Sequence, residues 1–233
     1  MDVSQKQWHE PAPEDYSRVT NPERFWPLHQ HALDLLAQLE ATYDVTRSEA
    51  FALIPGIMRP FEYARPSVTL TPVAPDAAPV AIAFTTFPSL VVRCGRWHSQ
   101  PFPSCGCDAC AEDAAGEAER LEGILGKVVA GRFSEELRIP LFGDARLMHA
   151  FPSGPPSVEW SGEGWTTLPR AVARSLAGSG PRRVQWQPWP RRWRQAAIVR
   201  AVLEVLLSLL FALSVRHTGL GAFGWCEGAG GAN

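Results

Sequence analysis

Lysine is nearly absent from this chain. Lys6 and Lys127 are the only two, and removing them from the 22 basic residues leaves 20 arginines. Such a skew reflects the base composition of a genome as readily as a function. We therefore do not interpret it as nucleic-acid recognition, and we expect no nucleic-acid partner.

Recognisable catalytic motifs are also missing. The chain has no GxSxG nucleophile elbow, no HExxH zinc helix, no P-loop and no GxGxxG dinucleotide fingerprint. Its carboxylates show no paired spacing that would indicate acid–base catalysis. The sequence therefore favours a binding or structural role over an enzyme, and it indicates no small-molecule substrate.

The N-terminus lacks the apolar core of a secretory signal peptide, because residues 1–10 are mostly polar. We therefore expect a cytoplasmic protein, whose thiols stay reduced. Five cysteines, an odd number, also argue against a disulfide framework.

Hydrophobic periodicity predicts two principal helices. Apolar residues recur at helical spacing from Leu28 to Tyr43, and a second apolar stripe covers about 109–131. A shorter helix is expected near 169–177. His29 falls on the predicted outward face of the first helix, and we expect both His29 and His31 to be solvated polar residues and not ligands.

Short β-like runs, bounded by prolines, lie between and after the helices. The links between the early runs are too short for a helical crossover, so antiparallel pairing is expected. The fold class is therefore α+β, with a mainly antiparallel sheet against two principal helices. The predicted strands are about 44–52, 66–72, 79–86, 89–97, 133–139, 145–151, 156–161 and 183–187.

Three of the five cysteines fall in one stretch, Phe102-Pro103-Ser104-Cys105-Gly106-Cys107-Asp108-Ala109-Cys110. Cys107-x-x-Cys110 is the spacing with which two thiolates bind one zinc ion from a tight turn. Cys105 adds a third thiol. A tetrahedral site then needs one more ligand, which His98 or alternatively Cys94 could supply. The sequence thus predicts a structural zinc site with the ligands Cys105, Cys107, Cys110 and His98.

Two other interpretations of these thiols stay open. They could be reduced cysteines without a ligand, or a redox group, because a helix N-terminus lowers thiol pKa values and favours disulfide formation. Asp108, Glu112 and Asp113 lie at the start of the predicted second helix, where its dipole favours acids. A metal- or thiol-dependent enzyme that uses the CxCxxC cluster is the alternative to a structural site.

Three stretches together resemble the domain-of-unknown-function 6226 family of bacteria. They are Tyr16-Ser17-Arg18-Val19-Thr20-Asn21-Pro22-Glu23-Arg24-Phe25, then Tyr43-Asp44-Val45, then the Phe102–Cys110 run. The resemblance covers about residues 10–193. It implies no activity and therefore no catalytic residue. The long apolar tail departs from the family pattern.

Charge is distributed unevenly along the chain. Between Gly164 and Leu203 there are eight arginines and no acid, so an acidic body precedes a basic tail. Such a tail suits an anionic partner such as a membrane surface, although the arginines could instead pair with the body or be solvated. The residues expected to make this contact are Trp189, Arg191, Arg192, Trp193 and Arg194, and the alternative is that Trp186 and Trp189 are buried in a last strand.

An apolar segment follows at 196–215. It has the length that spans a bilayer, but it contains Arg200 and Glu204. On an insertion scale, an apolar gain of roughly 5 kcal/mol is about cancelled by the cost of two charges. We therefore expect a C-terminal apolar helix that either inserts into a membrane or packs on the domain. Insertion would leave the body facing the cytosol by the positive-inside rule.

These features predict three segments: a flexible N-terminus at 1–15, an α+β domain at 16–190, and a basic and apolar helical tail with a Gly-rich end at 191–233. The expected function is that of a cytosol-facing binding or structural domain with a structural zinc site and a C-terminal membrane anchor.

Overall fold

The computed structural model of the chain describes residues 12–51, 62–152, 163–178 and 180–192. The chain divides into two compact units, Met1–Arg192 and Trp193–Asn233. All described residues belong to the first unit. The apolar segment predicted at 196–215 and the strand predicted at 156–161 lie outside the described residues.

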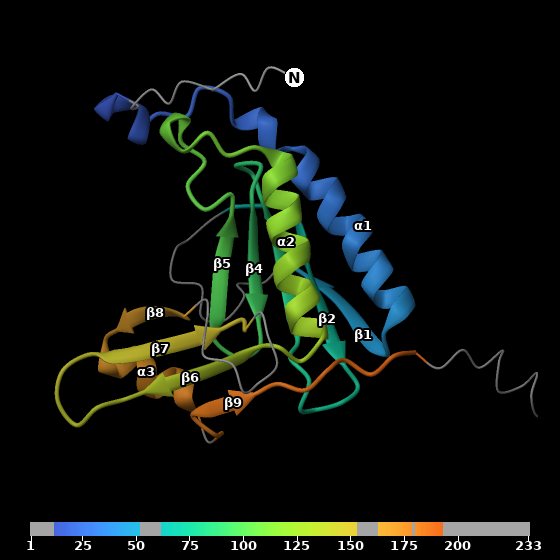
Figure 1. The fold of residues 1–233 in the computed structure, drawn as a ribbon, viewed down its shortest axis with the longest axis vertical. Coiled ribbons are helices and arrows are strands. Elements are labelled where there is room, and N and C mark those ends of the chain that lie inside the picture. The colour runs from blue at the N-terminus through green and yellow to red at the C-terminus, as the bar shows by residue number, and fades with distance from the viewer. Residues whose placement is uncertain (1–11, 52–61, 153–162, 179, 193–233) are drawn as a thin grey trace, which may run out of the picture. The chain divides into compact units, whose positions relative to one another are not determined.

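The first sheet is a five-stranded antiparallel meander, in which each strand pairs with its neighbours in the sequence (Figure 1). The short links produce this order, as predicted. The strand predicted at 89–97 ends at Cys94, because Gly95, at a φ of 66°, turns the chain back into an additional strand. The five strands are β1 (Val45–Ala50), β2 (Tyr63–Pro72), β3 (Val80–Thr85), β4 (Leu90–Cys94) and β5 (His98–Phe102).

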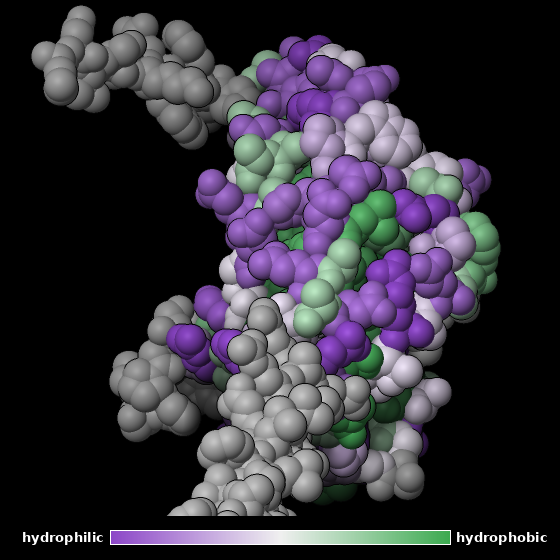
Figure 2. Space-filling view, turned by 90° about the vertical axis from the view of Figure 1, so that its right-hand side faces the viewer, coloured by the Kyte–Doolittle hydropathy of each residue, from purple (hydrophilic) through white to green (hydrophobic). Residues whose placement is uncertain are grey.

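Two helices, α1 (Pro27–Thr42) and α2 (Ala114–Val129), pack against one face of this sheet (Figure 1). Their outward surface is largely hydrophilic, with apolar side chains visible between the polar ones (Figure 2). None of the helices among the described residues is long and apolar enough to cross a membrane. The core between helices and sheet includes Leu28, Leu36, Ile82, Phe84, Leu121 and Leu125, each at most 1% exposed.

A second antiparallel sheet, with the order β8-β7-β6-β9, follows α2. Its strands are β6 (Ser134–Arg138), β7 (Ala145–Ala150), β8 (Glu163–Leu168) and β9 (Arg183–Gln185), and α3 (Arg170–Ala177) lies between the last two in the sequence. The sequence predicted one main sheet. The chain instead forms two, because β6 pairs with β7 and β9 rather than with the first meander. A separate small core serves this sheet: Trp97, Leu137, Ala145, Leu147, Leu168 and Ala173.

A buried carboxylate joins the two sheets. Glu135 of β6 is 1% exposed, and its oxygens accept the backbone N–H groups of Arg96, Trp97 and His98 at 2.6, 2.9 and 3.2 Å. The same carboxylate accepts the indole N–H of Trp186 at 3.1 Å. Burial raises the pKa of Glu135, and the four N–H donors oppose that rise. The turn between β4 and β5 is therefore held to the second sheet by one side chain.

His29 of α1 is buried, whereas the sequence predicted that it would be exposed to solvent. The imidazole is 8% exposed, and its Nε2 atom lies 3.0 Å from the carbonyl oxygen of Ser89 in the turn between β3 and β4. Burial therefore lowers the pKa of His29. His31, in contrast, is partly exposed and pairs with Glu122 at 3.0 Å. The prediction of a solvated side chain was wrong for His29, because the β3–β4 turn folds over the start of the helix.

Candidate metal centre

The three clustered cysteines lie on residues 103–113, called here the cysteine turn, which join β5 to α2. A single 3₁₀ turn, η3 (Asp108–Cys110), occupies its middle. This turn contacts η1 (Pro13–Tyr16), a 3₁₀ turn near the start of the described chain (Figure 1). A second one, η2 (Pro22–Phe25), leads into α1. The cysteine turn thus packs beside residues that precede the first helix.

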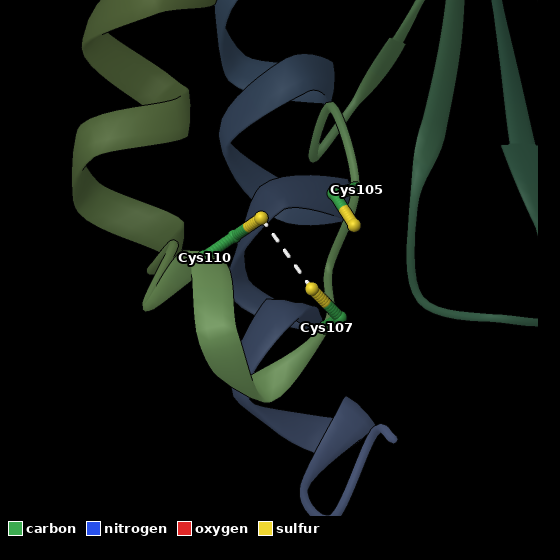
Figure 3. A group of neighbouring side chains, drawn as sticks. All are labelled: Cys105, Cys107 and Cys110. Atoms are coloured by element: carbon green, nitrogen blue, oxygen red, sulfur yellow. Dashed lines mark hydrogen bonds between the residues drawn. The ribbon is translucent and has the colours of Figure 1, made fainter. Parts of the chain in front are cut away.

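The sulfur atoms of Cys105, Cys107 and Cys110 all lie within 4.8 Å of one another. The Cys107 and Cys110 sulfurs are 3.4 Å apart and point toward each other, with Cys105 beside them (Figure 3). Zinc–sulfur bonds of about 2.3 Å at tetrahedral angles place two sulfurs about 3.8 Å apart. The observed spacing therefore fits three thiolates on a single ion with small adjustments of the side chains.

The thiols differ in how easily they ionise. A hydrogen bond from Cys105 lowers the pKa of Cys107, whereas the hydrogen bond with Cys107 raises the pKa of Cys110 to about 12. Cys107 is buried, while Cys105 and Cys110 are exposed. Between these two residues the thiolate is therefore favoured on Cys107, and the exposed thiols of Cys105 and Cys110 are accessible to a ligand from solution.

Glu112 organises the backbone on which the thiols are carried. Its carboxylate accepts the N–H groups of Ser104, Cys105 and Gly106 at 3.2, 3.1 and 2.7 Å. Three consecutive N–H groups directed at one anion fix a compact turn. Gly106 has a φ of 80°, and a Cβ atom there would lie 3.3 Å from the Phe87 ring, so glycine suits both the conformation and the close packing.

The acid inside the CxxC spacing has a different partner. Asp108 accepts the backbone N–H and the hydroxyl of Thr20, at 3.0 and 3.2 Å, and the guanidinium of Arg18 at 3.1 Å. In return, the Asp108 N–H donates to the carbonyl oxygen of Arg18 at 2.9 Å. These donors hold the pKa of Asp108 below its ordinary value, with the Thr20 N–H as the main cause.

Arg24 joins η2 to the same turn. Its guanidinium donates to the carbonyl oxygens of Gly106, Cys107 and Glu112 at 3.0, 3.4 and 3.1 Å. Carbonyl groups that are occupied in this way cannot rotate freely, so the peptide units around Cys107 are fixed from the N-terminal side. Three side chains, Glu112, Asp108 and Arg24, therefore preorganise the turn before any ligand binds.

The structure does not bring His98 or Cys94 to the three thiols. These two residues pair with each other where β4 turns into β5, whereas the cysteine turn follows Phe102 at the other end of β5. Phe102 lies four residues after His98, a distance of about 13 Å at the rise per residue of an extended strand. His98 instead packs against His149, with ring centroids 3.8 Å apart, and burial lowers its pKa to about 3. Cys94 is fully buried, and burial raises its pKa.

Trp189 and Trp186 are buried, which bears out the alternative interpretation of these residues and not the membrane contact expected of Trp189. Trp189 is 3% exposed, its indole N–H donates to the carbonyl oxygen of Ala78 at 2.8 Å, and its ring meets Tyr43 edge-on. The structure therefore places Trp189 in the core rather than on a membrane-binding surface. Arg191 and Arg192 are exposed, and Trp193 and Arg194 lie outside the described residues.

Fold and site together define a two-sheet α+β domain with a preorganised turn that could hold a metal on three cysteines. The chain belongs to the family of unknown function DUF6226, whose model matches residues 4–193. This confirms the resemblance seen in the sequence. Neither a curated protein nor a solved structure matches the chain.

Proposed function

We propose that the domain binds one zinc ion through Cys105, Cys107 and Cys110, and that the ion stabilises the contact between the cysteine turn and the residues before α1. The observation that carries this proposal is the convergence of three sulfur atoms within 4.8 Å. Thiolates are the ligands that zinc prefers in structural sites. The role is that of a cytosol-facing binding or structural domain.

The surroundings of the thiols support a cation with sulfur ligands. A zinc ion with three thiolates carries a net charge of −1, and the guanidinium of Arg24 binds the carbonyl oxygens of Gly106 and Cys107 next to it. A nearby positive charge favours the thiolate forms that a metal requires. The ion would bridge the two halves of the turn, so its binding energy would add to the stability of the fold.

The alternative is a metal- or thiol-dependent enzyme built on the same cysteines, and the surroundings distinguish the two. Catalysis by a metal requires an open position beside a cleft. A described cavity of about 140 Å³ lies elsewhere, between residues of β6, β7 and β9 that include Glu135, His149 and Arg183. The cysteine turn does not contribute to this cavity. The structural role is favoured because Asp108 and Arg24 already tie the turn to the residues before α1.

Metal content is the decisive measurement. The full chain would be purified under reducing conditions and compared with a Cys107→Ser/Cys110→Ser variant and with Cys94→Ala as the matched control. About one zinc per chain is expected in the wild type and in the control, and none in the double variant. A chelator should lower the thermal midpoint of the wild type and leave the double variant unchanged. Equal zinc in all three proteins, or none in any, would refute the site.

The tail supports a second proposal, in which residues 196–215 attach the domain to a membrane and leave it on the cytosolic side. Its support is the apolar composition of the segment and the arginines before it, of which Arg191 and Arg192 are exposed. Membrane fractionation of the full chain and of a version that ends at Arg192 tests it. Release of the shortened version alone supports the anchor, and identical fractionation of both refutes it.

A further inference from the structure

We infer that the fourth coordination position of this metal site is taken by a thiolate from outside the chain. The inference rests on the proposed function and extends it, because it names the class of ligand that the site accepts. Three sulfurs leave a tetrahedral ion with one position to fill. Among the described residues, the group of metal-ligating side chains that converge here ends with Cys105, Cys107 and Cys110.

The two nearest carboxylates are engaged in holding the turn. Both oxygens of Glu112 accept backbone N–H groups, from Ser104 on one and from Cys105 and Gly106 on the other. Both oxygens of Asp108 are likewise engaged, one by Thr20 and the other by Arg18. Either acid would have to give up these bonds in order to reach the metal, and for Glu112 the partly buried Gly106 N–H would then lose its acceptor.

The exposure of the site favours a ligand that arrives from solution. Cys105 and Cys110 are exposed, so the side of the cluster that they form is accessible. Sulfur is the donor that matches the three already present, because soft thiolate ligands select the same metals. Arg18, also exposed, pairs with both Asp15 and Asp108, so its charge is already balanced and the selection of the incoming ligand rests on its sulfur donor.

The Phe87 ring could make a cysteine of a partner protein bind more tightly to the site than a free thiol such as glutathione. This side chain is 39% exposed, and it packs over Gly106, between the first two cysteines. A cysteine flanked by apolar residues would gain contact with Phe87, whereas glutathione would not. The two sources of the same thiolate can therefore be separated by their dependence on this ring.

Cobalt substitution makes the ligands visible, because sulfur-to-cobalt charge transfer and the d–d bands report the number of thiolates. The full chain loaded with Co²⁺ would be titrated with glutathione and with the peptide acetyl-Leu-Cys-Leu-amide. The serine forms of both probes serve as controls. An increase in charge-transfer intensity by about a third is expected, since a fourth sulfur joins three, and the serine probes should cause no change.

The outcomes separate the two proposals. If Co²⁺ shows no sulfur charge transfer at all, the metal site itself is refuted. If three sulfurs bind but millimolar thiol leaves the spectrum unchanged, the external ligand is refuted. It is also refuted if the spectrum shows four ligands from the chain itself before any thiol is added. Equal binding of both probes points to a free thiol. Tighter binding of the peptide, lost in Phe87→Ala, points to a partner protein that supplies the cysteine.

Discussion

The carboxylate of Asp108 accepts both the backbone N–H and the hydroxyl of Thr20, 88 residues earlier in the chain. Asp108 lies between Cys107 and Cys110, so the same short segment carries two thiols and a contact to the residues before α1. A change that orders one of these partners also orders the other. If the turn binds a metal, we therefore expect that binding to be coupled to docking of the N-terminal residues, in both directions.

Replacing Asp108 by alanine tests this coupling. The Asp108→Ala variant should show faster hydrogen exchange at the Thr20 amide and weaker zinc binding, because the turn loses its partner in the N-terminal segment. Exchange measured by mass spectrometry and a zinc competition titration give the two readings. Asp34→Ala, on the exposed face of α1, should change neither. Faster exchange without any loss of affinity would show that the two events are independent.

Glu135 offers a prediction about stability rather than ligand binding. The Glu135→Gln variant retains one acceptor oxygen, while its amide N–H₂ replaces the other and faces N–H groups that had donated to the carboxylate. Those N–H groups lose their acceptor, and each unpaired donor costs about 1–3 kcal/mol. Chemical denaturation should show this loss in the free energy of unfolding. Glu136→Gln, the neighbouring residue that pairs with Arg138 near the surface, should cost only about 0.2–1 kcal/mol. Equal losses would contradict the role assigned to Glu135.

The raised pKa of Glu135 gives this difference a pH dependence. A carboxyl whose pKa is higher in the folded than in the unfolded state contributes stability below its ordinary value of 4.5, and loses it as the pH rises through the folded value. The unfolding free energy of the wild type relative to Glu135→Gln should therefore be largest in acid and should decrease as the pH rises above 4.5. A difference that grows with pH would show that the four N–H donors outweigh burial.

Gly164 is predicted to be required by its neighbour on β7. A Cβ atom at this position would overlap the His149 ring, so Gly164→Ala should displace the imidazole from its place against His98. Such overpacking costs about 1–3 kcal/mol. Gly123→Ala, where nothing lies within 4 Å of the new methyl, should instead stabilise α2 by about 0.5–1 kcal/mol. Thermal unfolding together with histidine NMR shifts checks both, and unchanged His149 signals in Gly164→Ala would contradict the packing argument.

Local patterns sufficed for most of the elements. The apolar stripe of α1 and the short proline-bounded links correctly predicted a helix and an antiparallel meander, because helix period and loop length act within a few residues. The division into two sheets follows instead from the pairing of β6 with β9, more than 45 residues later in the chain. Glu135 then joins the two sheets by binding the turn at Arg96 and Trp97, more than 35 residues earlier. No periodicity in the sequence reports such a contact.

The candidate site shows the same division. The CxCxxC spacing correctly grouped three cysteines, because residues within a six-residue segment stay close together in space. The sequence suggested His98 as a further ligand from its proximity along the chain, but an extended strand carries it away. Asp108 and Glu112 were interpreted as acids at a helix start. Their role in binding N–H groups of the turn and of Thr20 became visible only in three dimensions, and Asp113 alone caps α2, at 2.8 Å from Gly116 N.

Glu112 should determine how well the turn is preorganised for a metal. The Glu112→Ala variant removes the acceptor of three N–H groups around Cys105, so these peptide units become free to rotate. The metal must then order the three sulfurs as it binds, and this cost reduces its affinity. Zinc affinity should fall by about 10–100-fold, the range found for groups that orient metal ligands. Competition with a chromophoric chelator measures this. Glu119→Ala, an exposed acid on α2, is the matched control for charge and should leave the affinity unchanged. An equal loss in both variants would assign the effect to net charge, and no loss in Glu112→Ala would show that the thiols alone order the turn.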